Sequence, residues 1–138
     1  LDYMEVGYKT TDGLFNRNEV GPWRFCDEID LAQVISPSTL KIATMVDVGR
    51  IRPEDIPPCA DSSIDVIRIA TYAHQMDDAL RLLDHCLKQG YETCMNVMAV
   101  STFAPDDVDT FLVQLAKSGI HNVALVDSYG ALYPYHVR

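Results

Sequence analysis

Short apolar runs rich in β-branched residues alternate with helical patterns along this chain, and that alternation most constrains its fold. Five runs are expected as strands, at residues 3–8, 40–47, 64–71, 91–100 and 122–127. The two clearest helical patterns lie between the last three runs, from Met76 to Leu87 and from Pro105 onward. Strands that alternate with helices form βα units around a parallel sheet. The sequence therefore predicts one α/β domain over residues 1–138, with about five parallel strands.

Glycine and proline mark the expected ends of these helices. Gly90 and Gly119 stand where a left-handed C-terminal cap is wanted, and Pro105 with two following aspartates suits a first helical turn. Inward positions of the second helix are expected at Val108, Phe111, Leu112, Leu115 and Ala116. A short helix is expected over residues 27–35, after a polar loop through residues 10–22.

The strand–helix spacing predicts an incomplete (β/α)8 barrel. An intact barrel of this type has eight such units in about 250 residues, or ~30 residues per unit. An open doubly wound sheet is the alternative, weakened because the chain has no GxGxxG turn and no GxxxxGK[ST] loop.

The charge of the chain limits its partners. A net charge of -9 argues against a nucleic-acid partner and disfavours an anionic membrane, because both attract lysine and arginine. The chain has no long apolar run and no signal-peptide pattern, and its four cysteines lack CxxC spacing. We therefore expect reduced, mostly buried thiols in a cytoplasmic protein, and the missing initiator methionine suggests a segment of a longer polypeptide.

Polar residues in or directly after the strand runs are the candidates for chemistry, because catalytic groups of parallel α/β folds collect at the carboxyl ends of strands. Glu5 and Arg68 are the most informative, since an ionised side chain within an apolar run needs a partner or a wet cavity. They could orient an anionic substrate or its enolate, or form a structural pair across neighbouring strands. The other positions that this rule nominates are Asp47, Thr71, Asn96, Ser101, Asp127 and Ser128.

Several of these positions also have a local explanation. Asp127 could hold a basic group, a water or a ligand hydroxyl, or with Ser128 it could satisfy backbone donors of an Asx-type turn. Asp47 precedes Val48-Gly49 and fits a turn residue, and Ser101 could instead cap the following helix. No histidine pair has metal-ligand spacing, and no GxSxG nucleophile elbow occurs.

Five phrases in order resemble the HMGL-like (pyruvate carboxyltransferase) superfamily, and most closely its 4-hydroxy-2-oxovalerate aldolase branch. The phrases are Leu1-Asp2-Tyr3-Met4-Glu5-Val6-Gly7-Tyr8, Asp65-Val66-Ile67-Arg68-Ile69-Ala70-Thr71, Gly90-Tyr91-Glu92-Thr93, Asn96-Val97-Met98-Ala99-Val100-Ser101 and Val126-Asp127-Ser128-Tyr129-Gly130-Ala131. The resemblance implies that the five runs match barrel strands two to six.

On that mapping, the resemblance implies that Glu5, Arg68 and Asp127 are catalytic and meet at one rim. It implies that Thr71, Asn96, Ser101 and Ser128 contact substrate. The family also binds a divalent metal (Mg, Mn or Zn), through a first-strand aspartate and a seventh-strand His-X-His pair. Neither of those segments occurs in this chain, so none of its residues is expected as a metal ligand.

The resemblance implies a metal-dependent aldolase or lyase that cleaves or forms a C–C bond in 2-oxo acids. A Claisen-type acyltransferase, like isopropylmalate or homocitrate synthase, is the first alternative, and a non-catalytic, self-associating segment is the second. This chain alone is expected to have negligible turnover, because the metal-binding strands are absent. Expected partners are a small oxo-acid or acyl substrate, further copies of the chain, and an aldehyde dehydrogenase of the kind the family associates with.

Overall fold

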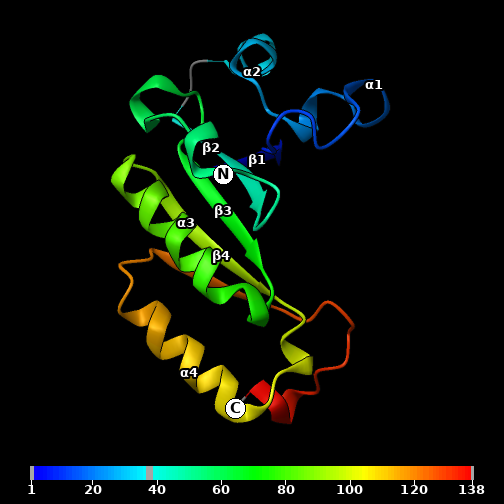
Figure 1. Cartoon of the computed structure of the whole chain (residues 1–138), viewed down its shortest axis with the longest axis vertical. Helices are drawn as coiled ribbons and strands as arrows, with labels where there is room; N and C mark the ends of the chain where they lie inside the picture. Colours follow the sequence, from blue (N-terminus) through cyan, green and yellow to red (C-terminus); the bar gives the residue numbers. More distant parts are fainter. Residues whose placement is uncertain (1, 37–38, 138) are drawn as a thin grey trace.

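The computed structural model describes residues 2–36 and 39–137, and a five-stranded parallel sheet is its centre (Figure 1). The strands follow one another in chain order, β1-β2-β3-β4-β5, and each pairs in parallel with the next. They are β1 (Tyr3–Tyr8), β2 (Lys41–Asp47), β3 (Val66–Thr71), β4 (Glu92–Met98) and β5 (Asn122–Val126). Parallel strands in sequential order, joined by helices, confirm the partial (β/α)8 barrel.

Four α-helices lie between the strands within the described residues. They are α1 (Arg17–Val20), α2 (Glu28–Val34), α3 (Met76–Lys88) and α4 (Pro105–Ala116). Short 3-10 turns supplement them at η1 (Pro22–Arg24), η2 (Pro53–Asp55), η3 (Cys59–Asp61), η4 (Ala73–Gln75), η5 (Val100–Thr102) and η6 (Pro134–Val137). Figure 1 shows α3 and α4 on the same side of the sheet.

The two faces of the sheet differ in burial. Ile67, Ile69, Met95 and Val97 are fully buried, and they pack in one core with α3 and α4. Because successive side chains of a strand point to opposite faces, Arg68 lies on the other face, which is only partly covered. The partly covered face corresponds to the interior of a barrel, and a substrate site is therefore expected on it.

The predicted helix ends are confirmed. Pro105 is the first residue of α4, and Gly90 and Gly119 follow α3 and α4 with φ of 89° and 77°. The inward side of α4 was predicted too broadly, since Leu112 and Ala116 are exposed whereas Phe111 and Leu115 are buried. Successive helix positions are about 100° apart. Phe111 and Leu115 therefore face the sheet, whereas Leu112 and Ala116, one position further on, do not.

The segment between β1 and β2 contains a helix that the sequence pattern did not indicate. α1 has four residues, and the Asn16 side chain caps it by accepting from the backbone N–H of Asn18 at 3.1 Å. The next helix, α2, matches the prediction and buries Leu31. Glu28 ties α2 to a serine pair, accepting from Ser62 Oγ at 2.7 Å and from the backbone N–H of Ser63 at 2.9 Å.

The four cysteines are free, as expected, and Cys26 and Cys86 are fully buried. Burial raises the pKa of the Cys86 thiol to about 12, so it stays protonated and unreactive at neutral pH. Within residues 2–36 and 39–137, none of the helices is long and apolar enough to span a membrane.

Candidate functional site

Glu5 and Arg68 form an ion pair on the partly covered face of the sheet. Arg68 Nη1 donates to Glu5 Oε2, across the intervening strand β2. About a third of each side chain is exposed, at 32% and 35%. The pair borders a cavity of about 460 Å³, whose lining residues are Tyr3, Glu5, Ala43, Val66, Arg68, Glu92, Cys94 and Asn122. A charged pair that faces a cavity, rather than the core, can reach a ligand.

The level of this pair along the strands differs from the expected one. Arg68 is the third residue of β3 and lies level with Met45, Cys94 and, through Cys94, Asn122. Glu5 is likewise the third residue of β1. The pair therefore belongs to the amino-terminal half of the sheet, and the expectation that it shares the carboxyl rim with Asp127 is wrong.

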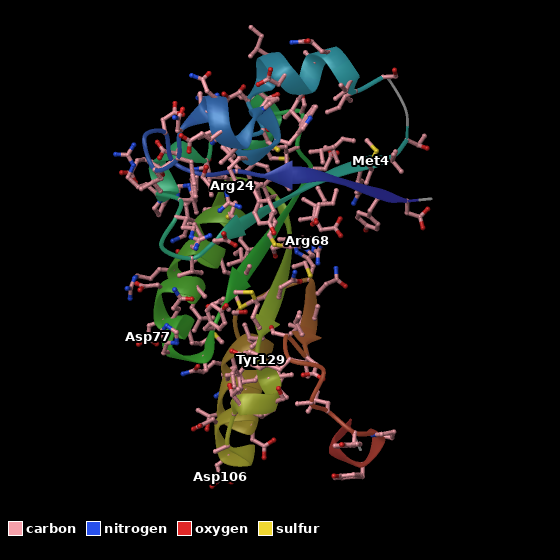
Figure 2. The ribbon with its side chains drawn as sticks, turned by 90° about the vertical axis from the view of Figure 1, so that its right-hand side faces the viewer. Met4, Arg24, Arg68, Asp77, Asp106 and Tyr129 are labelled. Atoms are coloured by element: carbon pink, nitrogen blue, oxygen red, sulfur yellow. The ribbon has the colours of Figure 1, made fainter. Side chains whose placement is uncertain are left out.

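Asp127 and Ser128 lie at the carboxyl end of β5, next to the turn after β4. Ser128 Oγ accepts from the backbone N–H of Ala99 at 2.9 Å, and Asp127 Oδ2 accepts from that of Leu132 at 2.8 Å. Asp127 follows Asn122 by five residues, or about 16 Å of strand at ~3.3 Å per residue. Figure 2 shows Arg68 well apart from Tyr129, which follows this turn.

The pKa of the Asp127 carboxyl is lowered, chiefly by the hydrogen bond from the backbone N–H of Leu132. The Ser101 hydroxyl contributes from nearby, although Ser101 Oγ and Asp127 Oδ1 are both buried without a well-formed hydrogen bond among the described residues. The backbone N–H of Gly130 also donates to the Asp127 carbonyl, at 3.2 Å. The local-turn interpretation therefore has direct support, and the carboxylate stays ionised at neutral pH.

The two remaining predicted contacts lie on opposite faces. Asn96 is buried on the face of Arg68, where Cys94 Sγ is 3.8 Å from its Oδ1. Thr71 is fully buried on the face that the helices cover, and its hydroxyl donates to the carbonyl of Tyr72 at 3.1 Å. Strand alternation points Thr71 away from the cavity that Arg68 borders. Arg68 and Thr71 were predicted to belong to one site, and the structure places them on opposite faces of the sheet.

A second polar cavity lies at the carboxyl rim, and sequence reasoning identified only one of its charged residues. Asp47 ends β2, and its Oδ2 accepts from Arg24 Nη2 at 3.2 Å and from Arg50 Nη1 at 3.0 Å. This arginine pocket has a volume of about 290 Å³. Its lining residues are Tyr8, Arg24, Asp47, Val48, Arg50, Ala70, Tyr72, Gln75 and Met98. Figure 2 shows Arg24 near the arrowhead of β1, whereas Met4 lies nearer to the start of that strand.

Metal ligation has no support from the described side chains. They contain no group of three or more histidine, cysteine, aspartate or glutamate residues able to hold an ion. Residues 2–36 and 39–137 therefore offer no set of ligands that fits the divalent cation implied by the resemblance.

Known proteins resemble this chain in sequence and in structure, although no family model matches it. 4-Hydroxy-2-oxovalerate aldolase 2 of Mycobacterium ulcerans (strain Agy99) is 33% identical over 92 residues, covering 67% of this chain and 26% of that protein. 4-Hydroxy-2-oxovalerate aldolase 6 of Rhodococcus jostii (strain RHA1) is 25% identical over 113 residues, covering 80% of this chain and 32% of that protein.

A solved structure extends the similarity to the whole fold. The N-terminal domain of a candidate aldolase from Bacteroides vulgatus superposes with a TM-score of 0.81 at 29% identity, covering 99% of this chain and 46% of that one. The chain spans about a quarter to a third of the curated relatives it matches, at 26% and 32%. Together these findings place the chain among the relatives of the 4-hydroxy-2-oxovalerate aldolases, as a segment equivalent to part of their length.

Proposed function

We propose that this chain forms one wall of the active site of an aldolase or lyase that acts on 2-oxo acids. The similarity to two 4-hydroxy-2-oxovalerate aldolases carries the proposal. The structure adds a guanidinium, that of Arg68, held by Glu5 at the edge of a cavity on the partly covered sheet face. A fixed cation is what the anionic substrate and its enolate need from such a wall.

The reaction places specific demands on these side chains. Cleavage of a 4-hydroxy-2-oxo acid breaks the bond between C3 and C4, while the hydroxyl proton passes to a base and an aldehyde forms. The bonding electrons remain on the oxo-acid fragment as an enolate, which then takes up a proton. Arg68 would donate to the developing enolate oxygen, and Glu5 would hold the guanidinium in place.

A divalent metal (Mg, Mn or Zn) is part of the proposal through the superfamily resemblance. Such a metal would act as a Lewis acid on the oxo-acid oxygens. The described residues offer no ligand set for it, so this chain would contribute Arg68 and Glu5 to the site but no metal ligand.

The test is an aldol-cleavage assay on the full polypeptide that contains this chain. The protein is incubated with 4-hydroxy-2-oxovalerate and Mg2+ or Mn2+, and pyruvate release is followed with lactate dehydrogenase and NADH. We expect pyruvate release, and a loss of about 100-fold in kcat/KM for Arg68→Met. Arg81→Met is the matched control, because Arg81 is exposed on α3 and pairs with Asp78.

Three outcomes of this assay bear on the proposal. An Arg68→Met variant as active as Arg81→Met would remove Arg68 from the site. Release of free CoA from acetyl-CoA and a 2-oxo acid, without aldol cleavage, would favour the Claisen alternative. For the isolated chain of 138 residues we expect negligible turnover, and a rate close to that of the full polypeptide would contradict this.

Self-association is the second candidate role, and the exposed edge of the sheet favours it. Val123 and Leu125 of β5 are 39% and 51% exposed, and an edge strand can pair with another chain. Light scattering of the purified chain at several concentrations should show oligomers, and a strictly monomeric species would contradict this role. We also propose a cytoplasmic protein and an aldehyde dehydrogenase as partner. Co-purification from the native host tests the partner, and fractionation of the same cells tests the location.

A further inference from the structure

The arginine pocket contains a largely buried guanidinium, that of Arg24, whose hydrogen-bonding groups are not all satisfied. The Arg24 side chain is only 17% exposed, and its Nε is buried without a hydrogen-bond partner among the described residues. The guanidinium carbon lies 4.5 Å from the centre of the Tyr8 ring and 4.4 Å from that of the Phe15 ring. Two aromatic rings therefore fix the guanidinium, while its hydrogen-bonding capacity remains incomplete.

The charges that line the pocket do not cancel. Arg24 and Arg50 contribute two positive charges, and both donate to the same oxygen of Asp47, which supplies one negative charge. The remaining lining residues are uncharged. A pocket with one surplus positive charge is notable in a chain whose net charge is -9. An anion that enters the pocket would neutralise the positive charge that Asp47 leaves uncompensated.

The size and position of the pocket restrict the anion. Its volume of about 290 Å³ lies at the lower end of the usual range for small-molecule sites, about 300–1,000 Å³, which suits an acid of a few carbons. It lies at the carboxyl ends of β1 to β4, where Tyr8, Asp47 and Met98 are the last strand residues. In barrels of this type, ligands bind at that end.

We propose that the arginine pocket is a carboxylate subsite, in which Arg24 and Arg50 bind the carboxylate of a small 2-oxo acid. The identity of the acid as a substrate rests on the proposed function, whereas binding of the carboxylate does not. A planar guanidinium matches a planar carboxylate with two parallel hydrogen bonds. Asp47 is a positioning residue, because it holds both guanidinium groups without needing to touch the ligand itself.

The binding experiment uses sodium pyruvate as the probe and the 138-residue chain as it is. Titration is followed in 1H–15N spectra, which include the Arg24 Nε–H signal, and by calorimetry at low salt. We expect saturable binding that shifts this signal, and no shift with the uncharged methyl pyruvate. Arg24→Gln should weaken binding about 30-fold, as expected for loss of a charged hydrogen-bonded group.

Three further variants distinguish specific binding of pyruvate from a nonspecific effect of charge and from unfolding. Arg17→Gln is the matched control, because Arg17 also lies over an aromatic ring, 4.0 Å from the centre of Phe25, but its partners are Asp12 and Asp27. It should leave pyruvate binding unchanged. Arg24→Lys keeps the charge but loses the planar fork, so binding should weaken by about 10-fold. Arg50→Gln changes a side chain that is 55% exposed, and it should weaken binding without unfolding the chain.

The outcomes separate the two proposals. Arg24-dependent pyruvate binding without aldol cleavage by the full polypeptide supports the subsite and removes the proposed function. Aldol cleavage with unchanged KM in both Arg24→Lys and Arg50→Gln overturns the subsite and leaves the function standing. Inorganic phosphate binding more tightly than pyruvate through the same two arginines would also overturn the carboxylate assignment.

Discussion

Gly7 connects the fold to the arginine pocket, and replacing it with alanine is the sharpest test of the packing. Gly7 lies in β1 with φ of 150°, and a Cβ built there would be 2.3 Å from the carbonyl oxygen of Trp23. Non-bonded heavy atoms prefer about 3.5 Å, so η1 would have to move by roughly 1 Å. Since η1 includes Arg24, the same movement would displace the pocket's buried cation.

The size of the effect follows from two contributions. Overpacking against backbone costs about 1–3 kcal/mol, and a side chain at this φ costs about 1–3 kcal/mol more. We therefore expect Gly7→Ala to lower the free energy of unfolding by about 2–6 kcal/mol, measured by urea denaturation. The matched control is Gly13→Ala, because Gly13 has φ of 86° but nothing within 4 Å of its built Cβ. It should lose only about 1–2 kcal/mol, from backbone strain.

A spectroscopic reading locates the change. Trp23 is the single tryptophan of the chain, so its fluorescence reports on η1 directly. Gly7→Ala should shift the emission of the folded protein and weaken pyruvate binding, while Gly13→Ala should do neither. If both variants unfold at the same urea concentration with the same emission, the close approach of β1 and η1 is wrong as described.

Three further predictions concern the ion pair, the thiols and acid stability. Glu5→Gln should lower the free energy of unfolding by no more than about 1 kcal/mol, because a third of each partner is exposed. A double-mutant cycle with Arg68→Met measures the coupling energy of the pair, and a value above about 2 kcal/mol would contradict this. Cys86, with its pKa raised to about 12, should resist iodoacetamide at pH 8 until urea unfolds the chain. The partly exposed Cys59 and Cys94 should react before it, and mass spectrometry of labelled peptides measures the order. Burial raises the pKa of Glu28, but hydrogen bonds from the serine pair outweigh it and the net pKa is lowered. This stabilisation is therefore present above the unfolded pKa of about 4.3 and is lost as pH falls through the lower folded value. Urea midpoints at pH 7 and pH 3 should differ less in Glu28→Gln than in the parent chain, and an equal difference would contradict the assignment.

The architecture was readable from the sequence because strands and helices of this chain have unambiguous local signals. The runs of β-branched residues are bounded by turn residues, and α3 and α4 have helical spacing with glycine after each end. α1 was missed for a physical reason. With four residues it is too short for a periodic pattern, and its stability comes from the Asn16 cap and the tertiary contacts of its neighbours.

The candidate site was only partly readable, because its geometry depends on strand register. The sequence paired Glu5 with Arg68 as one of two alternatives, and the structure shows that pair. It could not give the level of the pair along the sheet. The level of a residue relative to another strand is set by the pairing register between the two strands, which the pattern of one strand alone does not give. The error over a shared rim with Asp127 arose from that missing information.

Arg24 illustrates the opposite difficulty, in which a residue's importance comes entirely from the tertiary structure. In the sequence it stands in a Pro-Trp-Arg-Phe segment of a loop, where an arginine is ordinarily a solvated charge. Folding brings β1 and the end of β2 around it, and it becomes a buried cation with an unpaired Nε and a shared aspartate. Leaving a buried N–H unpaired costs about 1–3 kcal/mol, but the Nε is closed to solvent, so a ligand carboxylate would meet the guanidinium through its Nη groups. The carboxylate subsite therefore rests on the surplus positive charge of Arg24 and Arg50 over Asp47, at the rim where a ligand would bind.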